Sequence, residues 1–519
     1  MKKRMKQMLA LGLAVMLVLG GCAEEPKKPV IEETPQVEET VETEEQEIVE
    51  EEPIAELTDT ETVLKVNVDK NQKTYYLENG ELPYLYLEYC DVKVSGGLNE
   101  NLKKNIENWS MEQNEEFRSE AVSLETDAAE AMNNAGEELW QYTISQNVET
   151  ARIDGSVVSL IEDTYHYMGG AHGTLIREGI NFDVKNGKRI DFQELFSDYE
   201  NFKSYATDRI IYQLQENYED QLFEDYVETI ESMWLNDLGP SWYFDASGMV
   251  IVLEQYMVGP YSLGIPEIYL PYVEIRQYIK EAYMPDTADS VARFRQNQEV
   301  CLTLPESEEE IAIMLRSELK DDMMYNSLWL GSSKVQLQDY VIVMGAYVIR
   351  NSGELYCLIV VDEASDDYKT YIFRLTEGKL EKVDELYAAI DDSNINIEEI
   401  RVRETVYLLG TYGGEKTYFF DENGQFVTED SEFALSQNEF VLTTKADIPV
   451  TLEGTESVLP SGSHIILTAT DDETYVKFTI QETGQEGMMM VERNENDYYQ
   501  ITVGGMNEND CFELLPYAG

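Results

Sequence analysis

Short segments in which apolar and polar residues alternate recur along this chain from about residue 63, and they constrain the fold more than any other feature. Alternation with a period of two is typical of β-strands that bury one face. TVLKVNVDK and NGELPYLYLEYCDVKVSG are two such segments. Asn79-Gly80 and Asn186-Gly187 are turn pairs beside strands, and residues 245–248 provide the turn of a predicted hairpin. We therefore expect the chain to fold around β-sheets.

Three segments of the same region carry apolar residues at helical spacing instead. The first begins near Asn99 and the third is LFEDYVETIESMW. The apolar positions of the first two are Leu98, Leu102, Ile106, Trp109 and Phe117, then Phe202, Ala206, Ile210 and Leu214. Strands and helices are grouped in residues 63–283 rather than strictly alternating, which predicts an α+β domain.

The rest of the chain is richer in strands. A polar break at MPDTADSVARF precedes residues 299–435, which are predicted to form a mainly antiparallel β domain. Within it, SEEEIAIMLRSELKDDM has helical periodicity with Ser307 as a candidate N-cap. Residues 440–519 have short strands and tight turns that suit a small SH3-like β-barrel. The predicted fold class is thus multidomain: an α+β ectodomain, a mainly antiparallel β domain and a small barrel.

The N-terminus indicates where the protein resides. MKKRMKQ is basic, the following apolar run is short for a membrane span, and the run ends in LGGC. This order resembles a bacterial lipoprotein signal over residues 1–22, which implies that Cys22 is lipidated and becomes the first mature residue. Residues 23–62 are acidic and lack aromatic side chains, so they are expected to form a disordered tether. The predicted location is the outer face of the cell membrane, held by lipid alone.

The charge of the chain excludes some partners. With 38 Lys and Arg against 102 Asp and Glu, the formal net charge is −64. Such a chain repels nucleic acid and does not bind anionic lipid directly. A cationic partner fits this charge, and keeping an exposed protein soluble is the simpler interpretation.

Four further cysteines are scattered along the chain without the paired spacing of a zinc site. Disulfides are chemically permitted outside the cell, but spacing does not identify pairs. We interpret most of the four as small buried apolar residues. They are Cys90, Cys301, Cys357 and Cys511.

YHYMGGAHG, residues 165–173, holds two of the three histidines of the chain. The simplest interpretation is a glycine turn between strands, because glycine permits positive φ. A recognition loop is the second interpretation, since loops on rigid strands often carry function. A metal site with His166, His172 and Glu162 or Asp163 is the third. The candidate ligand-binding residues are Tyr165, His166, Gly169, Gly170 and His172.

Four segments in fixed order carry a resemblance to a known family. They are YHYMGGAHG, NFDVKNGKRIDFQELF, SWYFDASGMVIVLEQYMVGPYSLGIPEI and YLPYVEI. Together they resemble the extracellular domains beside the catalytic domain of PdaC-type peptidoglycan deacetylases, and the extracellular part of lysozyme-sensing anti-sigma factors. The resemblance covers residues 63–283. It adds a second candidate binding segment with Tyr256, Tyr261 and Gly264.

The resemblance implies binding rather than chemistry. No deacetylase metal motif and no G-x-S-x-G nucleophile motif is found in the sequence. What it implies is residence near peptidoglycan and recognition of cell-wall glycan or peptide, or of a cationic protein such as lysozyme. No catalytic residue, metal or cofactor is assigned.

Residues 443–495 carry a second, looser resemblance, to bacterial SH3-type domains that attach proteins to the cell wall. DIPVTLEGTE, LPSGSHIILTATDDETYVKF and QEGMMMVER carry it. The residues that correspond to an aromatic groove are Tyr475, Phe478, Tyr498 and Tyr499, and core packing is the alternative explanation for them.

The expected function is therefore non-enzymatic binding of a cell-envelope or host ligand at the cell surface. One alternative is a metal-dependent hydrolase or deacetylase of wall glycan, with metal held by the two histidines of YHYMGGAHG and a carboxylate. The other alternative is an accessory partner that docks on another exported protein.

Overall fold

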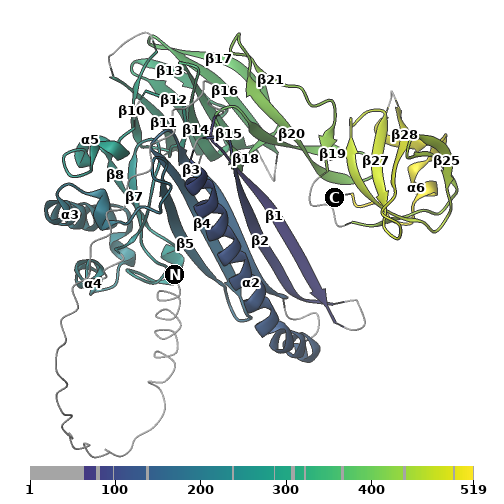
Figure 1. Cartoon of the computed structure of the whole chain (residues 1–519), viewed down its shortest axis with the longest axis horizontal. Coiled ribbons are helices and arrows are strands. Elements are labelled where there is room, and N and C mark those ends of the chain that lie inside the picture. Colours follow the sequence, from purple (N-terminus) through teal and green to yellow (C-terminus); the bar gives the residue numbers. More distant parts are fainter. Residues whose placement is uncertain are drawn as a thin grey trace, which may run out of the picture. The chain divides into compact units, whose positions relative to one another are not determined.

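The alternating segments form strands in the computed structural model of the chain, and the described strands make four sheets (Figure 1). Cys22, the tether at residues 23–62 and the Asn79-Gly80 turn lie outside the described residues. The described part belongs to one compact unit, Asp59–Gly519. The structure describes residues 63–77, 82–97, 99–135, 140–235, 239–285, 287–305, 310–320, 323–363, 367–435, 440–494 and 497–517.

The largest sheet of the N-terminal region has ten strands. Its hydrogen-bonding order is β1-β2-β3-β9-β14-β15-β16-β17, and β4 and β5 continue from β3. β2 and β3 pair in parallel, and the other neighbours are antiparallel. The strands are β1 (Lys65–Tyr76), β2 (Pro83–Ser95), β3 (Tyr142–Ile153), β4 (Val157–Tyr167), β5 (Thr174–Asp183), β9 (Ser290–Arg293), β14 (Ile342–Asn351), β15 (Glu354–Asp362), β16 (Tyr368–Thr376) and β17 (Lys379–Leu386).

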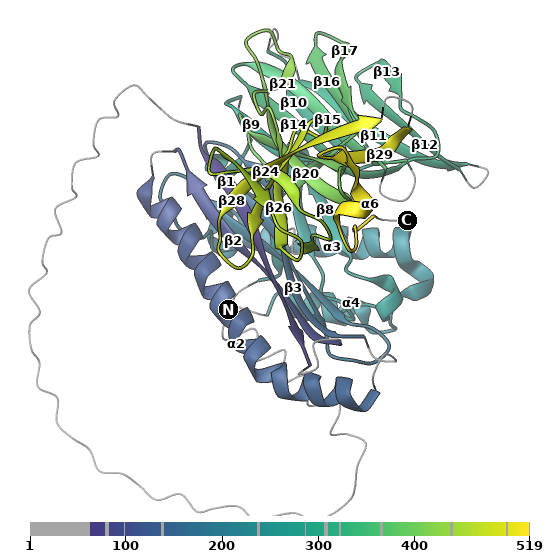
Figure 2. The ribbon, with the colours of Figure 1, turned by 90° about the vertical axis from the view of Figure 1, so that its right-hand side faces the viewer.

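One long helix, α2 (Glu100–Ala135), lies along β2, as Figures 1 and 2 both show. The Asn99 side chain accepts hydrogen bonds from the first backbone N–H groups of the helix and caps it. The apolar positions at helical spacing face the sheet and are buried, which confirms the predicted helix. They include Leu102, Ile106, Trp109 and Phe117; Leu98 lies outside the described residues.

A three-stranded sheet follows, packed with shorter helices. The predicted hairpin is confirmed: Asp245 N donates to Gly248 O at 3.0 Å between β6 and β7. The predicted second helix is α3, whose residues Phe202, Ala206, Ile210 and Leu214 are buried. The elements are η2 (Gln193–Leu195), α3 (Tyr199–Tyr218), η3 (Glu219–Gln221), α4 (Tyr226–Met233), β6 (Ser241–Phe244), β7 (Gly248–Val252), η4 (Tyr261–Leu263), β8 (Glu267–Pro271), α5 (Tyr272–Ile275) and η5 (Glu281–Tyr283).

The predicted break between residues 283 and 299 does not separate two sheets. β9, from the polar segment of that break, pairs with β3 on one side and with β14 on the other. Residues 63–283 and 299–435 therefore share one sheet and one apolar core, in which Val66 and Val92 belong with Ile349 and Leu358. Segment composition did not predict this continuity because strand pairing joins residues that are far apart in sequence.

The helix predicted at residues 307–323 is wrong. Residues 310–320 instead form a strand of a four-stranded antiparallel sheet, in which Ile313 and Leu315 are buried in alternation, and the predicted cap Ser307 lies outside the described residues. In this short segment the same apolar positions fit both the alternation of a strand and the spacing of a helix. Hydrogen bonding to a neighbouring strand on each side favours the strand. The four strands are β10 (Glu299–Thr303), β11 (Glu310–Lys320), β12 (Met323–Leu330) and β13 (Ser333–Gln336).

The remaining strands form a thirteen-stranded antiparallel sheet rather than a closed barrel in the described residues. β22 pairs with β20 and with β26, so this sheet also crosses the predicted boundary near residue 440. α6 (Glu508–Cys511) follows the last strand. The strands are β18 (Ala389–Ile395), β19 (Ile400–Tyr407), β20 (Thr411–Phe420), β21 (Phe426–Thr428), β22 (Phe433–Ala434), β23 (Leu442–Thr443), β24 (Ile448–Leu452), β25 (Thr455–Leu459), β26 (His464–Thr470), β27 (Tyr475–Ile480), β28 (Glu486–Asn494), β29 (Asp497–Val503) and β30 (Met506–Asn507).

Two buried asparagines, Asn394 of β18 and Asn396 just after it, connect this part of the chain to β1. The Asn396 amide accepts from Val66 N at 2.8 Å and donates to Val66 O at 3.1 Å. The Asn394 amide accepts from Val68 N at 2.8 Å and donates to Val68 O at 2.9 Å. These side chains take the place of a neighbouring strand along the edge of β1, so its backbone groups are satisfied.

The four described cysteines are free thiols. Cys90, Cys357 and Cys511 are buried, as predicted for most of them. Cys301 is exposed, because it occupies an outward position in the alternation of β10. Within the residues that the structure describes, no helix combines the length and the apolar composition of a membrane span.

Candidate functional site

The segment YHYMGGAHG is a turn between β4 and β5, as predicted. His166 is opposite Thr174 in the strand register, and the chain reverses through Gly169 and Gly170, whose φ angles are +85° and +100°. These angles favour glycine. Tyr165 folds across Gly173, where an added Cβ would lie 2.5 Å from the tyrosine ring. The glycines therefore shape a turn that presents the residue between them, His172, to solvent.

The second candidate segment, residues 256–264, is also shaped by backbone constraints. Tyr256 has a φ of +66°, which is uncommon for a residue with a side chain. Gly259 passes so close to another segment that an added Cβ would lie 2.8 Å from Gln221 O. The short helix η4 carries Tyr261 and ends at Gly264, whose φ is +74°. This path presents two tyrosines at the surface.

The structure brings the two segments together. His172 stacks on Tyr261 with ring centroids 3.8 Å apart and planes 17° from parallel. The Tyr256 hydroxyl lies 3.2 Å from His172 Nε2. Tyr256 remains 48% exposed. We refer to His172, Tyr256 and Tyr261 as the aromatic cluster.

Hydrogen bonds assign the tautomer of His172. Its Nδ1 lies 3.2 Å from Gly173 O, and a carbonyl oxygen only accepts. Nδ1 therefore carries the proton in the neutral ring, and Nε2 accepts from the Tyr256 hydroxyl. This arrangement orients the imidazole for recognition and uses both of its nitrogens within the protein.

His166, in contrast, does not join the aromatic cluster. Its Nδ1 lies 3.0 Å from Glu120 Oε1, so the side chain links β4 to α2. No group of three or more His, Cys, Asp or Glu side chains in the described residues is arranged to hold a metal ion. His166 and His172 thus have separate surroundings, one on the helix and one at the loops.

A half-buried network of charges anchors both segments, and it was not identified from the sequence. Arg177 donates to Asp163 at 2.7 and 2.6 Å and pairs with Glu267 at 3.1 Å. Glu267 also accepts from Tyr243 and from Arg295, both at 2.7 Å. Burial alone would raise the pKa of Glu267, but Arg295 and Arg177 hold it below its usual value.

The network positions the aromatic cluster because its members begin or end the segments that carry it. Asp163 lies on β4 before the first turn, and Glu267 begins β8 after the second segment. The sequence did offer one signal for this network. Arg177 lies inside the predicted strand TLIREGINF of a chain that has few basic residues, and an arginine in that position needs acidic partners.

Of the four predicted groove residues in residues 440–519, the structure describes the side chains of Tyr475 and Phe478. Phe478 is 1% exposed and belongs to the apolar core, so it does not line a surface groove. The Tyr475 hydroxyl donates to Glu432 at 2.8 Å. Tyr498 and Tyr499 belong to β29, but their side chains lie outside the described residues.

Residues 193–273 match the model of a family described as protein of unknown function, DUF3298. The chain therefore carries a DUF3298 domain, which includes Tyr256 and Tyr261 of the aromatic cluster but not His172. No curated protein matches the chain.

Two solved structures of DUF3298 proteins are similar to part of the chain. The protein from Bacteroides fragilis is 16% identical, with a TM-score of 0.33, and the match covers 42% of this chain and 94% of that one. The protein from Pseudomonas aeruginosa is 18% identical, with a TM-score of 0.29, and the match covers 44% of this chain and 99% of that one.

Proposed function

We propose that the protein is a non-enzymatic, lipid-anchored surface protein that binds a cell-envelope or host ligand through the aromatic cluster. The observation that carries the proposal is the convergence of two segments, 84 residues apart at His172 and Tyr256, on one set of rings of which His172 and Tyr256 are exposed and Tyr261 is half-buried. Tyrosine side chains are enriched at binding surfaces because they offer large apolar area and a polar tip. Stacking holds these rings in place before a ligand arrives, which lowers the entropic cost of binding.

Charge favours a cationic protein, such as one resembling lysozyme, as the ligand. A formal charge of −64 attracts a cationic partner over long range and accelerates encounter. The resemblance of residues 63–283 to the extracellular part of lysozyme-sensing anti-sigma factors implies the same class of ligand. Cell-wall glycan or peptide is the other ligand that the family resemblances imply.

The location is part of the proposal. The sequence of residues 1–22 resembles a lipoprotein signal, so Cys22 would hold the protein on the outer face of the membrane. The acidic residues 23–62 would then act as a tether that sets the reach of the binding region. The SH3-type resemblance of residues 443–495 is consistent with a second contact to the wall.

The test is a binding measurement on the purified protein with lysozyme and with purified peptidoglycan in parallel, at low and at physiological salt. We expect Tyr261→Ala and His172→Ala each to weaken binding of the true ligand at least about tenfold, because central aromatic residues dominate such interfaces. Binding that survives physiological salt indicates specific contacts, because long-range attraction is screened there.

Tyr212→Ala is the matched control, because Tyr212 is an exposed tyrosine on α3 that is 52% accessible and lies outside the cluster. Its effect on the dissociation constant should stay within about twofold. Equal losses in the control and in the cluster variants, or no binding of either ligand, would refute the proposal.

A further inference from the structure

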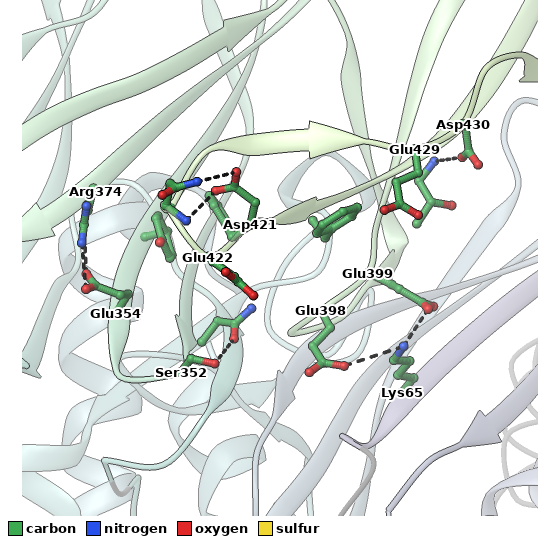
Figure 3. A pocket seen from close by; sticks show the side chains of 17 residues that line it. Lys65, Ser352, Glu354, Arg374, Glu398, Glu399, Asp421, Glu422, Glu429 and Asp430 are labelled. Atoms are coloured by element: carbon green, nitrogen blue, oxygen red, sulfur yellow. Dashed lines mark hydrogen bonds and ion pairs between the residues drawn. The ribbon is translucent and has the colours of Figure 1, made fainter.

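A pocket of about 770 Å³ lies far along the chain from the aromatic cluster, among the turns that follow β14, β18 and β20 (Figure 3). A volume of this size is typical of sites for small molecules. Lys65 of β1 and Arg374 of β16 also line it. The pocket therefore combines residues from both sides of the predicted domain boundary near residue 283.

The lining of the pocket is strongly acidic. Seven carboxylates and two basic side chains line it, which leaves a net formal charge of −5. Lys65 pairs with Glu399 at 2.6 Å and with Glu398 at 3.9 Å. Arg374 pairs with Glu354 at 2.7 Å. Figure 3 shows these two sets of ion pairs toward opposite sides of the view, with Glu422 between them.

The other four carboxylates have no basic side chain as a partner within the described residues. Asp421 accepts from the backbone N–H groups of Gln425 and Asn423, at 2.8 and 2.9 Å, and these bonds lower its pKa. Asp430 accepts from Thr417 N at 2.7 Å. The remaining two, Glu422 and Glu429, have no ion pair in the part of the chain that the structure describes. The pocket thus holds negative charge that the protein does not neutralise.

A second observation points to a ligand. Tyr356 lines the pocket, is only 2% exposed and stacks on Phe420 at 3.6 Å between ring centroids. Its hydroxyl has no hydrogen-bond partner among the described residues. The ring is enclosed while the hydroxyl faces the pocket, so a ligand in the pocket can form a hydrogen bond with it.

Gly424 keeps this hydroxyl open to the pocket. Its φ is +72°, and an added Cβ would lie 2.7 Å from Tyr356 Oη and 3.5 Å from Arg374 Nη1. A side chain at this position would therefore fill the space in front of the hydroxyl. The turn after β20 leaves the phenol accessible to a donor group that enters from the pocket.

We propose that this pocket binds a primary ammonium group on an alkyl chain. The carboxylates of Glu422 and Glu429 supply the charge, the Tyr356 hydroxyl accepts a hydrogen bond from the ammonium, and Phe419 offers an apolar surface to the alkyl chain. Two sources share this chemistry: a free linear polyamine, and the lysine side chain of a basic protein. The site is separate from the aromatic cluster and does not depend on it.

The experiment is calorimetric titration of the full chain at physiological salt with two probes, spermidine and a tri-lysine peptide with blocked ends. Their fully N-acetylated forms are the uncharged controls and should not bind. We expect saturable binding of at least one probe. Binding of spermidine alone indicates a free polyamine, and tighter binding of the peptide indicates a protein side chain.

Two variants test the assignment of residues. Glu422→Gln with Glu429→Gln should weaken binding at least about tenfold, because it removes two charges and keeps the side-chain size. Tyr356→Phe should weaken it about fivefold, because it removes one hydrogen bond and keeps the stacking on Phe420. Tyr256→Ala, in the aromatic cluster, should leave probe binding unchanged.

Glu456→Gln with Glu473→Gln is the matched control, because both residues are exposed acids outside the pocket lining. The same loss in the control as in the pocket variant would show that only general charge attraction is measured, and would overturn the proposal. Absence of saturable binding of both probes would overturn it as well.

Discussion

Arg152 carries a positive charge into the protein interior, where the residue is only 2% exposed. Its guanidinium donates to Asp154 at 2.6 Å, Tyr272 at 2.7 Å, Tyr283 O at 3.0 Å and Ser156 at 3.0 Å. Burial alone would raise the pKa of Asp154, but Arg152 and hydrogen bonds from Ser156 hold it below its usual value. The Arg152 side chain therefore connects β3 with residues 272–283, at and just after the end of the DUF3298 domain.

We predict that Arg152→Met lowers the free energy of unfolding by about 3–5 kcal/mol, because it leaves the Asp154 carboxylate buried without its counterion. Urea unfolding followed by circular dichroism measures the change. Arg276→Met is the control on an exposed arginine and should change stability by no more than about 0.5 kcal/mol. A small change for Arg152→Met would mean that the pair contributes little.

At the scale of elements, Glu162 links the helix and the sheet that it covers. Its Oε1 accepts from Gln146 Nε2 of β3 at 2.6 Å and from Gln113 Nε2 of α2 at 3.2 Å. Burial and, to a lesser extent, the charge of its cross-strand neighbour Glu178 together raise its pKa to about 7. The helix therefore rests on a carboxyl group that is protonated in mildly acidic solution.

The folded state binds the Glu162 proton more tightly than the unfolded chain, in which the pKa is near 4.5. The contribution of Glu162 to the free energy of unfolding is fully present below about pH 4.5 and is lost as the pH rises through about 7. We predict that Glu162→Gln keeps both accepted hydrogen bonds, removes this dependence and raises the free energy of unfolding at pH 8 by about 3 kcal/mol.

Urea unfolding of both proteins between pH 4 and pH 8 provides the measurement. The curves of wild type and Glu162→Gln should converge at the acidic end and separate above pH 7. Glu112→Gln, on the exposed face of α2, is the control and should follow the wild type throughout. Parallel curves for wild type and Glu162→Gln would contradict the prediction.

At the scale of the whole described chain, side-chain amides join strands that the sequence places more than 300 residues apart. Asn394 and Asn396 are 3% and 1% exposed and bond to both backbone groups of Val68 and Val66. The shared apolar core lies around them. Residues 63–283 and 299–435 therefore depend on each other for stability.

We predict that Asn394→Ala and Asn396→Ala each lower the free energy of unfolding, by about 1–3 kcal/mol for every backbone group left without a partner. The pair of substitutions should also make β1 accessible, which native-state hydrogen exchange of Val66 and Val68 detects. Asn101→Ala, an exposed position on α2, is the control. Unchanged exchange at β1 would show that the amides do not hold this edge.

The sequence by itself determined the local elements, that is, the helices and turns whose conformation depends on residues close to one another in the chain. Helical spacing identified α2 and α3, and the turn residues located the hairpin at residues 245–248 and the glycine turn before β5. These features follow from backbone angles and from which face of an element is apolar, and both are local properties. The same local analysis misassigned residues 307–323, where a strand and a helix bury similar positions.

Only the tertiary structure decided what depends on distant pairing. It joined β3 to β14 through β9, placed His166 against Glu120 and His172 against Tyr261, and formed the acidic pocket from three separate turns. Each of these contacts joins residues from different parts of the sequence, so the free energy of the contact cannot be inferred from either segment alone. Periodicity reports that a face is buried, and it carries no information about which residue covers that face.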